Sequence, residues 1–271
     1  MRKNYFEILK GTSVNPVVEL NKLHGLFKEK LWEINYSQSI YDLISKNFKV
    51  YKNRGHILSL DELIETMLVV PMTEEERLFC FSEMYLDLLS ILPYRKSVNL
   101  MHQVRYLEEQ IERTINLLGH KVVLIENKRI IIEDNVFADE AAQAVSGFAD
   151  IKEALSILEY NHFSNKGNIE RKKEILKKIA DLLEPWRKPL NKSNELKGLL
   201  KVNNDKIQAL EKLFYMYNKF NIRHNNEEQM LTGLSNQEIE SWYDKVYTLS
   251  LFIILGKDVA QILTDFSKLT E

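Results

Sequence analysis

Four adjacent side chains that form hydrogen bonds lie between two strongly apolar stretches: Arg223, His224, Asn225 and Asn226. A guanidinium offers a planar fork of donors that fits a phosphate, and an imidazole titrates near neutral pH. Together, such groups can bind a phosphodiester and move a proton. The same residue types are also typical of a polar connection between two helices, so the local sequence leaves both interpretations open.

Glu184 is a third group of interest, because it follows the apolar pair Leu182-Leu183 and precedes Pro185. A carboxylate at the end of a helix either orients a neighbouring Arg or His or lies on the surface. The sequence alone does not choose between these roles.

The region that precedes Arg223 in the sequence is rich in positive charge. Residues 164–201 carry eleven Lys or Arg against five Asp or Glu, a net of +6 in a chain whose formal net charge is −2. Arg171 and Lys172 lie on a predicted helix, and Arg187 and Lys188 follow it. Such residues contact phosphates in nucleic-acid complexes. A run of lysines is equally typical of the solvated face of an amphipathic helix.

Most other catalytic chemistries lack their signatures in this sequence. There is no Walker loop, dinucleotide fingerprint, HExxH, paired CxxC or GxSxG motif. The six histidines are scattered singly, so we predict neither a metal site nor a cofactor. Cys80, the single cysteine, lies in the apolar run 78–81 and is predicted to be a buried thiol. A chain without a second cysteine for a disulfide fits a reducing compartment.

The composition predicts an ordinary soluble globular protein, with 45% hydrophobic and 28% charged residues. The first seven residues lack the apolar stretch of a signal peptide, and no later run approaches the roughly 20 apolar residues of a membrane span. We therefore expect a cytoplasmic protein with no membrane contact.

Helices dominate the predicted elements, because the chain holds only 9 Gly and 5 Pro. Apolar residues at spacings of three and four predict an amphipathic helix from Pro16 to Ile34. Capping boxes begin at Ser59, Thr73 and Ser235. Further helices are predicted over about 97–118, 151–158, 175–183, 207–217 and 235–255.

An isolated β-hairpin is predicted where β-branched residues gather in two short runs, 120–125 and 129–133. Two strands alone are marginal in water, so we expect the hairpin to pack against helices and to mark a border. The predicted fold is mainly α, with one helical unit over 1–134 and a second over 135–271.

Residues 135–271 resemble the C-terminal HEPN-type domain of bacterial abortive-infection proteins of the AbiJ kind, an all-helical unit associated with phage defence. The resemblance rests on several short stretches: 150–155, 179–184, 209–215, 222–224 and the aromatic helix 242–255. Upstream, residues 26–32 are similar to the Leu-Trp element of the N-terminal domain in such proteins. The hairpin falls where related chains carry a short β insertion.

The resemblance implies a ribonuclease class that needs no metal, in which a dimer brings two Arg/His motifs together and RNA is cleaved by its own 2′-hydroxyl. In those ribonucleases four to six residues separate the Arg from the His. Here the corresponding positions after Arg223 hold Glu228, Gln229 and Met230, and His224 follows directly. Two hypotheses follow: a defence protein whose C-terminal unit acts on RNA or a nucleotide, or a non-catalytic module that dimerises or holds a partner protein of a defence system.

On the first hypothesis Arg223 holds the scissile phosphate, His224 acts as acid or base, and Glu184 orients one of them. Asn225 and Asn226 then add hydrogen bonds to RNA. We expect Glu184, Arg223 and His224 to share one cleft, although nearly forty residues separate the first from the others.

A homodimer is also predicted, because the final helix carries large apolar residues on more than one face. These residues are Trp242, Tyr243, Tyr247, Leu251, Phe252 and Ile254.

Overall fold

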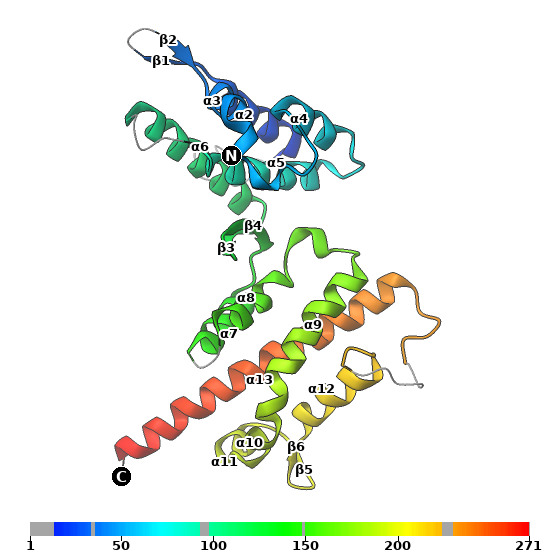
Figure 1. Cartoon of the computed structure of the whole chain (residues 1–271). Helices are drawn as coiled ribbons and strands as arrows, with labels where there is room; N and C mark the ends of the chain where they lie inside the picture. Colours follow the sequence, from blue (N-terminus) through cyan, green and yellow to red (C-terminus); the bar gives the residue numbers. More distant parts are fainter. Residues whose placement is uncertain (1–13, 34–35, 93–97, 148–149, 224–229, 271) are drawn as a thin grey trace, which may run out of the picture. The chain divides into compact units, whose positions relative to one another are not determined.

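The computed structural model describes residues 14–33, 36–92, 98–147, 150–223 and 230–270 (Figure 1). The chain divides into two compact units, Met1–Glu133 and Asp134–Glu271, a division one residue from the expected boundary. Over the described residues helices dominate, and each of three small sheets is a two-stranded antiparallel hairpin. The predicted mainly α class is confirmed.

Unit 1 is built around α5, which contributes eight buried hydrophobic side chains to its core. Its elements are α2 (Pro16–Lys28), β1 (Leu31–Glu33), β2 (Tyr36–Gln38), α3 (Ile40–Asn47), η1 (Phe48–Val50), η2 (Lys52–Arg54), α4 (Leu60–Val69), α5 (Glu74–Leu89), α6 (Val98–Leu117), β3 (His120–Ile125) and β4 (Lys128–Glu133). Helix α2 packs against α3, α5 and α6, and the rings of Phe27 and Tyr85 stack with centroids 4.4 Å apart.

The predicted caps begin their helices. Thr73 and Glu76 form a complete capping box, and Ser235 with Glu238 does the same at the last helix. At Ser59 the hydroxyl accepts the backbone N–H of Glu62, but the Glu62 carboxylate accepts the N–H of Leu58 at 2.8 Å instead. Each arrangement satisfies backbone donors that a helix start leaves free.

The predicted extension of the first helix to Ile34 is wrong, because α2 ends at Lys28. The backbone becomes extended at Glu29, and Leu31–Glu33 pairs with Tyr36–Gln38 as a hairpin. The Glu29 carbonyl accepts a hydrogen bond from Gln103 Nε2 of α6 at 3.2 Å. A partner from another helix therefore takes the carbonyl at the end of α2.

The hairpin β3–β4 confirms the prediction from β-branched residues. Its two-residue turn holds Glu126 and Asn127 at positive φ, the geometry that matches the twist of paired strands. The hairpin is anchored on helices: the N–H of Ile131 donates to Glu83 of α5 at 2.6 Å, and Arg129 donates to Glu108 of α6. The last element of unit 1 is thus a hairpin that helices cover on one side. Two strands alone are marginal in water and need such packing.

Cys80, predicted to be buried, is half-buried in α5. Burial raises the pKa of its thiol to about 11, and the nearby Glu83 and Glu76 act in the same direction. The thiol therefore stays protonated at neutral pH.

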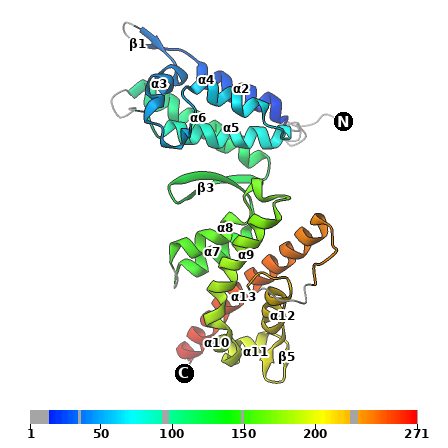
Figure 2. The same ribbon diagram turned by 45° about the vertical axis from the view of Figure 1, so that its right-hand side comes forward.

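Unit 2 is a helical bundle around one long helix, α13 (Asn236–Thr270), which contacts α7, α9, α11 and α12 (Figure 2). Its other elements are α7 (Val136–Ser146), α8 (Ile151–Glu159), η4 (Phe163–Asn165), α9 (Ile169–Leu183), η5 (Glu184–Trp186), α10 (Arg187–Lys192), α11 (Asn194–Leu199), β5 (Val202–Asn203), β6 (Lys206–Ile207) and α12 (Gln208–Lys219). The pieces between α9 and α12 are too short to show a period, so the sequence predicted only a basic connection there.

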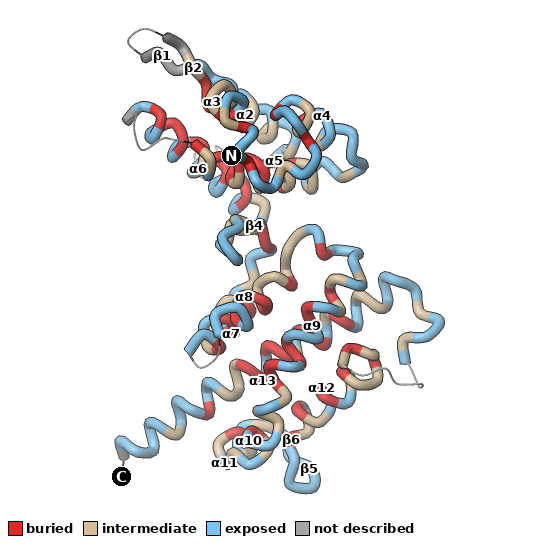
Figure 3. The backbone as a smooth tube through the Cα atoms, in the orientation of Figure 1, coloured by how far each residue is buried: buried red, intermediate tan, exposed pale blue. Residues whose placement is uncertain are grey.

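Helix α13 is buried along its middle and exposed toward its C-terminal end, as Figure 3 shows. Four of the residues assigned to a dimer surface, Tyr243, Tyr247, Leu251 and Ile254, are instead buried in the core of their own unit. Helix α13 is surrounded by other helices there, which explains apolar residues on several faces. Only Trp242 and Phe252 of that set are exposed.

By length and composition α13 could also cross a membrane, which differs from the expectation that no run approaches a span. A core helix of a soluble protein passes the same test, and 39% of its most apolar window is buried inside the protein.

Candidate functional site

Glu184 and Arg223 meet where α9 and α12 end. Arg223 Nη1 donates a hydrogen bond to Glu184 Oε2 at 2.6 Å, and Nε lies 3.8 Å from Asp181 Oδ1. The Arg223 side chain is only 14% exposed. The expected proximity of Glu184 and Arg223 is therefore confirmed, while His224, Asn225 and Asn226 lie outside the described residues.

The end of α12 fixes the position of Arg223. The backbone takes a left-handed conformation at Asn221, with φ of 56°, and the N–H groups of Ile222 and Arg223 both donate to the Tyr217 carbonyl. Ile222 is buried in the core, which anchors the turn. Tyr217 in turn bonds Ser250 of α13 at 2.6 Å. Arg223 is thus held by a helix cap of the kind that ends many α-helices.

The position of Glu184 follows from α9. Ile175, Ile179 and Leu183 bury one face of this helix, and Pro185 ends its hydrogen-bond ladder. Glu184 begins η5 directly after α9, and α9 contacts α12. Packing of the two helices therefore brings the carboxylate to the guanidinium.

Two guanidinium groups approach the buried ring of Phe214. The Cζ of Arg187 lies 4.8 Å from the ring centroid and that of Arg223 lies 6.0 Å from it. Arg187 also bonds both carboxylate oxygens of Glu211, at 2.7 and 3.3 Å, and Asn191 donates to the same carboxylate. Arg187 thus clamps α10 to α12.

Arg223 differs from Arg187 in the number of N–H groups that form hydrogen bonds to carboxylates. A guanidinium has five N–H groups. Among the described residues only the Glu184 bond uses one of them, and Nε is buried without a hydrogen-bond partner there. Nη2 makes no hydrogen bond with any described residue.

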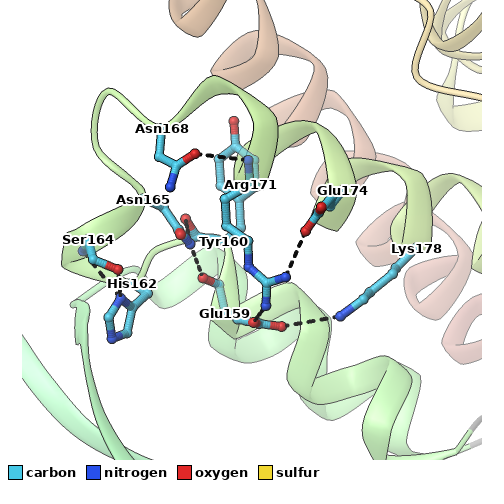
Figure 4. Close-up of polar contacts among 9 residues, drawn as sticks. All are labelled: Glu159, Tyr160, His162, Ser164, Asn165, Asn168, Arg171, Glu174 and Lys178. Atoms are coloured by element: carbon cyan, nitrogen blue, oxygen red, sulfur yellow. Dashed lines mark hydrogen bonds and ion pairs between the residues drawn. The ribbon is translucent and has the colours of Figure 1, made fainter.

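Arg171 lies in a network of ion pairs between α8 and α9 (Figure 4). Its Nη1 bonds Glu174 at 2.8 Å and its Nη2 bonds Glu159, which also lies 3.5 Å from Lys178 Nζ. The remaining exposed edge of Arg171 is partly neutralised, which weakens its expected role as a phosphate contact.

Lys172 is not on the surface, so its assignment as an RNA contact is corrected. Its side chain is 9% exposed, and its Nζ lies 2.7 Å from Glu240 Oε1 and 2.8 Å from Asp244 Oδ1. Tyr160 places its ring 5.2 Å from the ammonium and its hydroxyl on Asp244. Two carboxylates of α13 thus pair with the Lys172 ammonium, which has no such partner close to it in the sequence. Of the four basic candidates, Lys188 is exposed.

No group of three His, Cys, Asp or Glu side chains suited to a metal ion occurs in the described ranges. Over the described residues the site therefore consists of one guanidinium and two carboxylates, those of Arg223, Glu184 and Asp181. In such a set the guanidinium can donate to an anion while the carboxylates orient it, and a further group such as His224 is needed to move a proton.

Glu211→Gln is expected to lower the free energy of unfolding by about 1 kcal/mol at pH 7 and by nearly nothing at pH 3. The hydrogen bond from Arg187 lowers the pKa of Glu211. Its stabilising effect is therefore present above the carboxyl's usual pKa and is lost as the pH falls through the lowered one, below about pH 4. Urea unfolding at both pH values measures the difference, with the exposed Glu140→Gln as control. If Glu211→Gln lowers the free energy of unfolding by the same amount at both pH values, the ion pair with Arg187 does not stabilise the protein.

Comparison of the chain with protein-family models, with curated proteins and with solved structures finds no match.

Proposed function

We propose that this protein acts in bacterial antiphage defence of the abortive-infection type, in the cytoplasm, and that unit 2 is an HEPN-like effector that cleaves RNA. The resemblance of residues 135–271 supports the family. The proposed chemistry rests on the Glu184–Arg223 pair. Glu184 fixes a guanidinium whose other N–H groups make no hydrogen bond among the described residues. A group that is oriented before the substrate arrives stabilises developing charge without reorganisation.

In this proposal Arg223 donates to a non-bridging oxygen of the phosphate, while Glu184 and Asp181 hold its fork. His224, the next residue, takes the proton of the ribose 2′-hydroxyl or supplies one to the leaving 5′-oxygen. The 2′-oxygen attacks phosphorus and the bond to the 5′-oxygen breaks. The products are a 2′,3′-cyclic phosphate and a 5′-hydroxyl end. Lys188, Asn225 and Asn226 contact the RNA around this point.

The test uses the purified full chain and total RNA in the presence of EDTA. We expect cleavage by the wild type and a loss of about 100-fold or more in Arg223→Ala and in His224→Ala. Arg113→Ala removes an exposed arginine of α6 and is expected to cleave normally. Intact RNA at high protein excess, or equal cleavage by the wild type and both site variants, would refute the proposal.

The second candidate is a non-catalytic module for dimerisation or partner binding. The observation that favours it is a row of exposed apolar side chains in the second half of α13. Intact RNA combined with a stable dimer would select this alternative.

A further inference from the structure

From Phe252 to its C-terminal end, α13 carries large apolar side chains that are exposed. They are Phe252, Val259, Ile262, Leu263, Phe266 and Leu269, each between 36% and 82% exposed. We call these six residues the α13 seam. In Figure 1 the red end of α13 extends beyond the neighbouring α10 and α11. An isolated helical segment of this length is marginal in water, so a covering partner would stabilise it.

The spacing of the seam identifies the kind of partner. Phe252, Val259 and Phe266 follow one another at intervals of seven residues, and so do Ile262 and Leu269. The second series starts three residues after Val259, so residues 259, 262, 266 and 269 have the alternating three and four spacing of a heptad repeat. A repeat of 3.5 residues per turn keeps an apolar stripe facing another helix, as in a coiled coil.

We propose that the partner is a second copy of this chain, paired through α13 in a parallel two-stranded coiled coil. A twofold axis brings the same patch of both copies together, so one self-complementary seam is enough. A large aromatic side chain offers ~150–250 Å². With this range applied to all six residues at their observed exposures, the seam offers at most about 600 Å² per copy and about 1,200 Å² in the pair, the lower end of specific interfaces.

The charges beside the seam select the parallel orientation. Asp258 and Asp265 directly precede Val259 and Phe266 on the same edge and are both exposed. In an antiparallel pair these edges face each other, so that carboxylates oppose carboxylates. In a parallel pair Asp258 lies against the partner's Leu263, and no like charges meet. This interface differs from the one expected from sequence, and it does not depend on RNA cleavage.

The mass of the full chain in solution tests the proposal. Light scattering at micromolar concentration is expected to give twice the chain mass of 31.9 kDa. The double variant Ile262→Lys and Phe266→Lys is expected to weaken the dimer by roughly 100-fold or more, since it would bury unpaired charges. The matched double variant Gln261→Lys and Ser267→Lys, on the opposite side of the same turns, is expected to remain dimeric.

Crosslinking tests the orientation. In a Cys80→Ser background, Leu269→Cys is expected to form a disulfide between two copies on oxidation, because only a parallel pair brings residue 269 beside itself. A monomeric wild type, a seam double variant that stays dimeric, or absence of the crosslink would overturn the proposal. A second outcome would also overturn it: a monomeric wild type that binds vesicles of phosphatidylcholine and phosphatidylglycerol, together with a seam variant that does not bind them. That result would assign the seam to a membrane surface.

Discussion

Lys172→Met is expected to lower the free energy of unfolding of unit 2 by about 2–3 kcal/mol, although methionine fills a similar volume. The ammonium of Lys172 is the counter-charge of Glu240 and Asp244, which lie 2.7 and 2.8 Å from it. Its loss leaves the largely buried Glu240 carboxylate without the ammonium that pairs with it, while the Gly167 N–H still donates to it. The effect is below the ~3–5 kcal/mol of a fully buried pair because Asp244 is half-exposed. Denaturant unfolding followed by the fluorescence of Trp186 and Trp242 measures it.

Lys178→Met serves as the control for Lys172. Lys178 lies 54% exposed and 3.5 Å from Glu159, so its loss is expected to cost less than ~1 kcal/mol. A triple variant that adds Glu240→Gln and Asp244→Asn to Lys172→Met is expected to recover much of the loss, because it removes the uncompensated charges. If Lys172→Met alone proves neutral, the ion cluster does not stabilise the junction of α9 and α13.

Arg223→Lys is expected to slow RNA cleavage by about 100-fold while it preserves the positive charge. A lysine offers one compact ammonium, which cannot bond Glu184 and a phosphate with the fixed geometry of a fork. Glu184→Gln is expected to lie between wild type and Arg223→Lys, since the amide oxygen still accepts a hydrogen bond but carries no charge. Single-turnover cleavage of a short labelled RNA gives both rates.

Measuring the cleavage rate and the RNA affinity separately distinguishes a positioning role of Glu184 from a structural one. If Glu184 orients Arg223, Glu184→Gln should change the rate of the chemical step more than the affinity for RNA. Glu174→Gln changes an exposed acid of α9, the helix that precedes Glu184, and is expected to leave both unchanged. Arg223→Lys with the cleavage rate of the wild type would reduce Arg223 to part of a helix cap.

Features that depend on neighbours in the chain were predictable from sequence. The capping boxes at Thr73 and Ser235 and the hairpin β3–β4 form from contacts within a few residues. The helical periods of α9 and α12 predicted their buried faces for the same reason. Glu184 and Arg223 were identified by type and by their place at helix ends.

Features that depend on distant partners were decided by the tertiary structure. Helix α2 ends at Lys28, where Gln103 from α6 takes the next carbonyl, and Lys172 is buried because Glu240 and Asp244 of α13 reach it. Likewise the core residues of α13 run from Tyr243 to Ala260, whereas the C-terminal end of the helix is surface, since the other helices of unit 2 do not cover it. Periodicity shows that a helix has an apolar face, whereas only packing shows whether the same chain covers it.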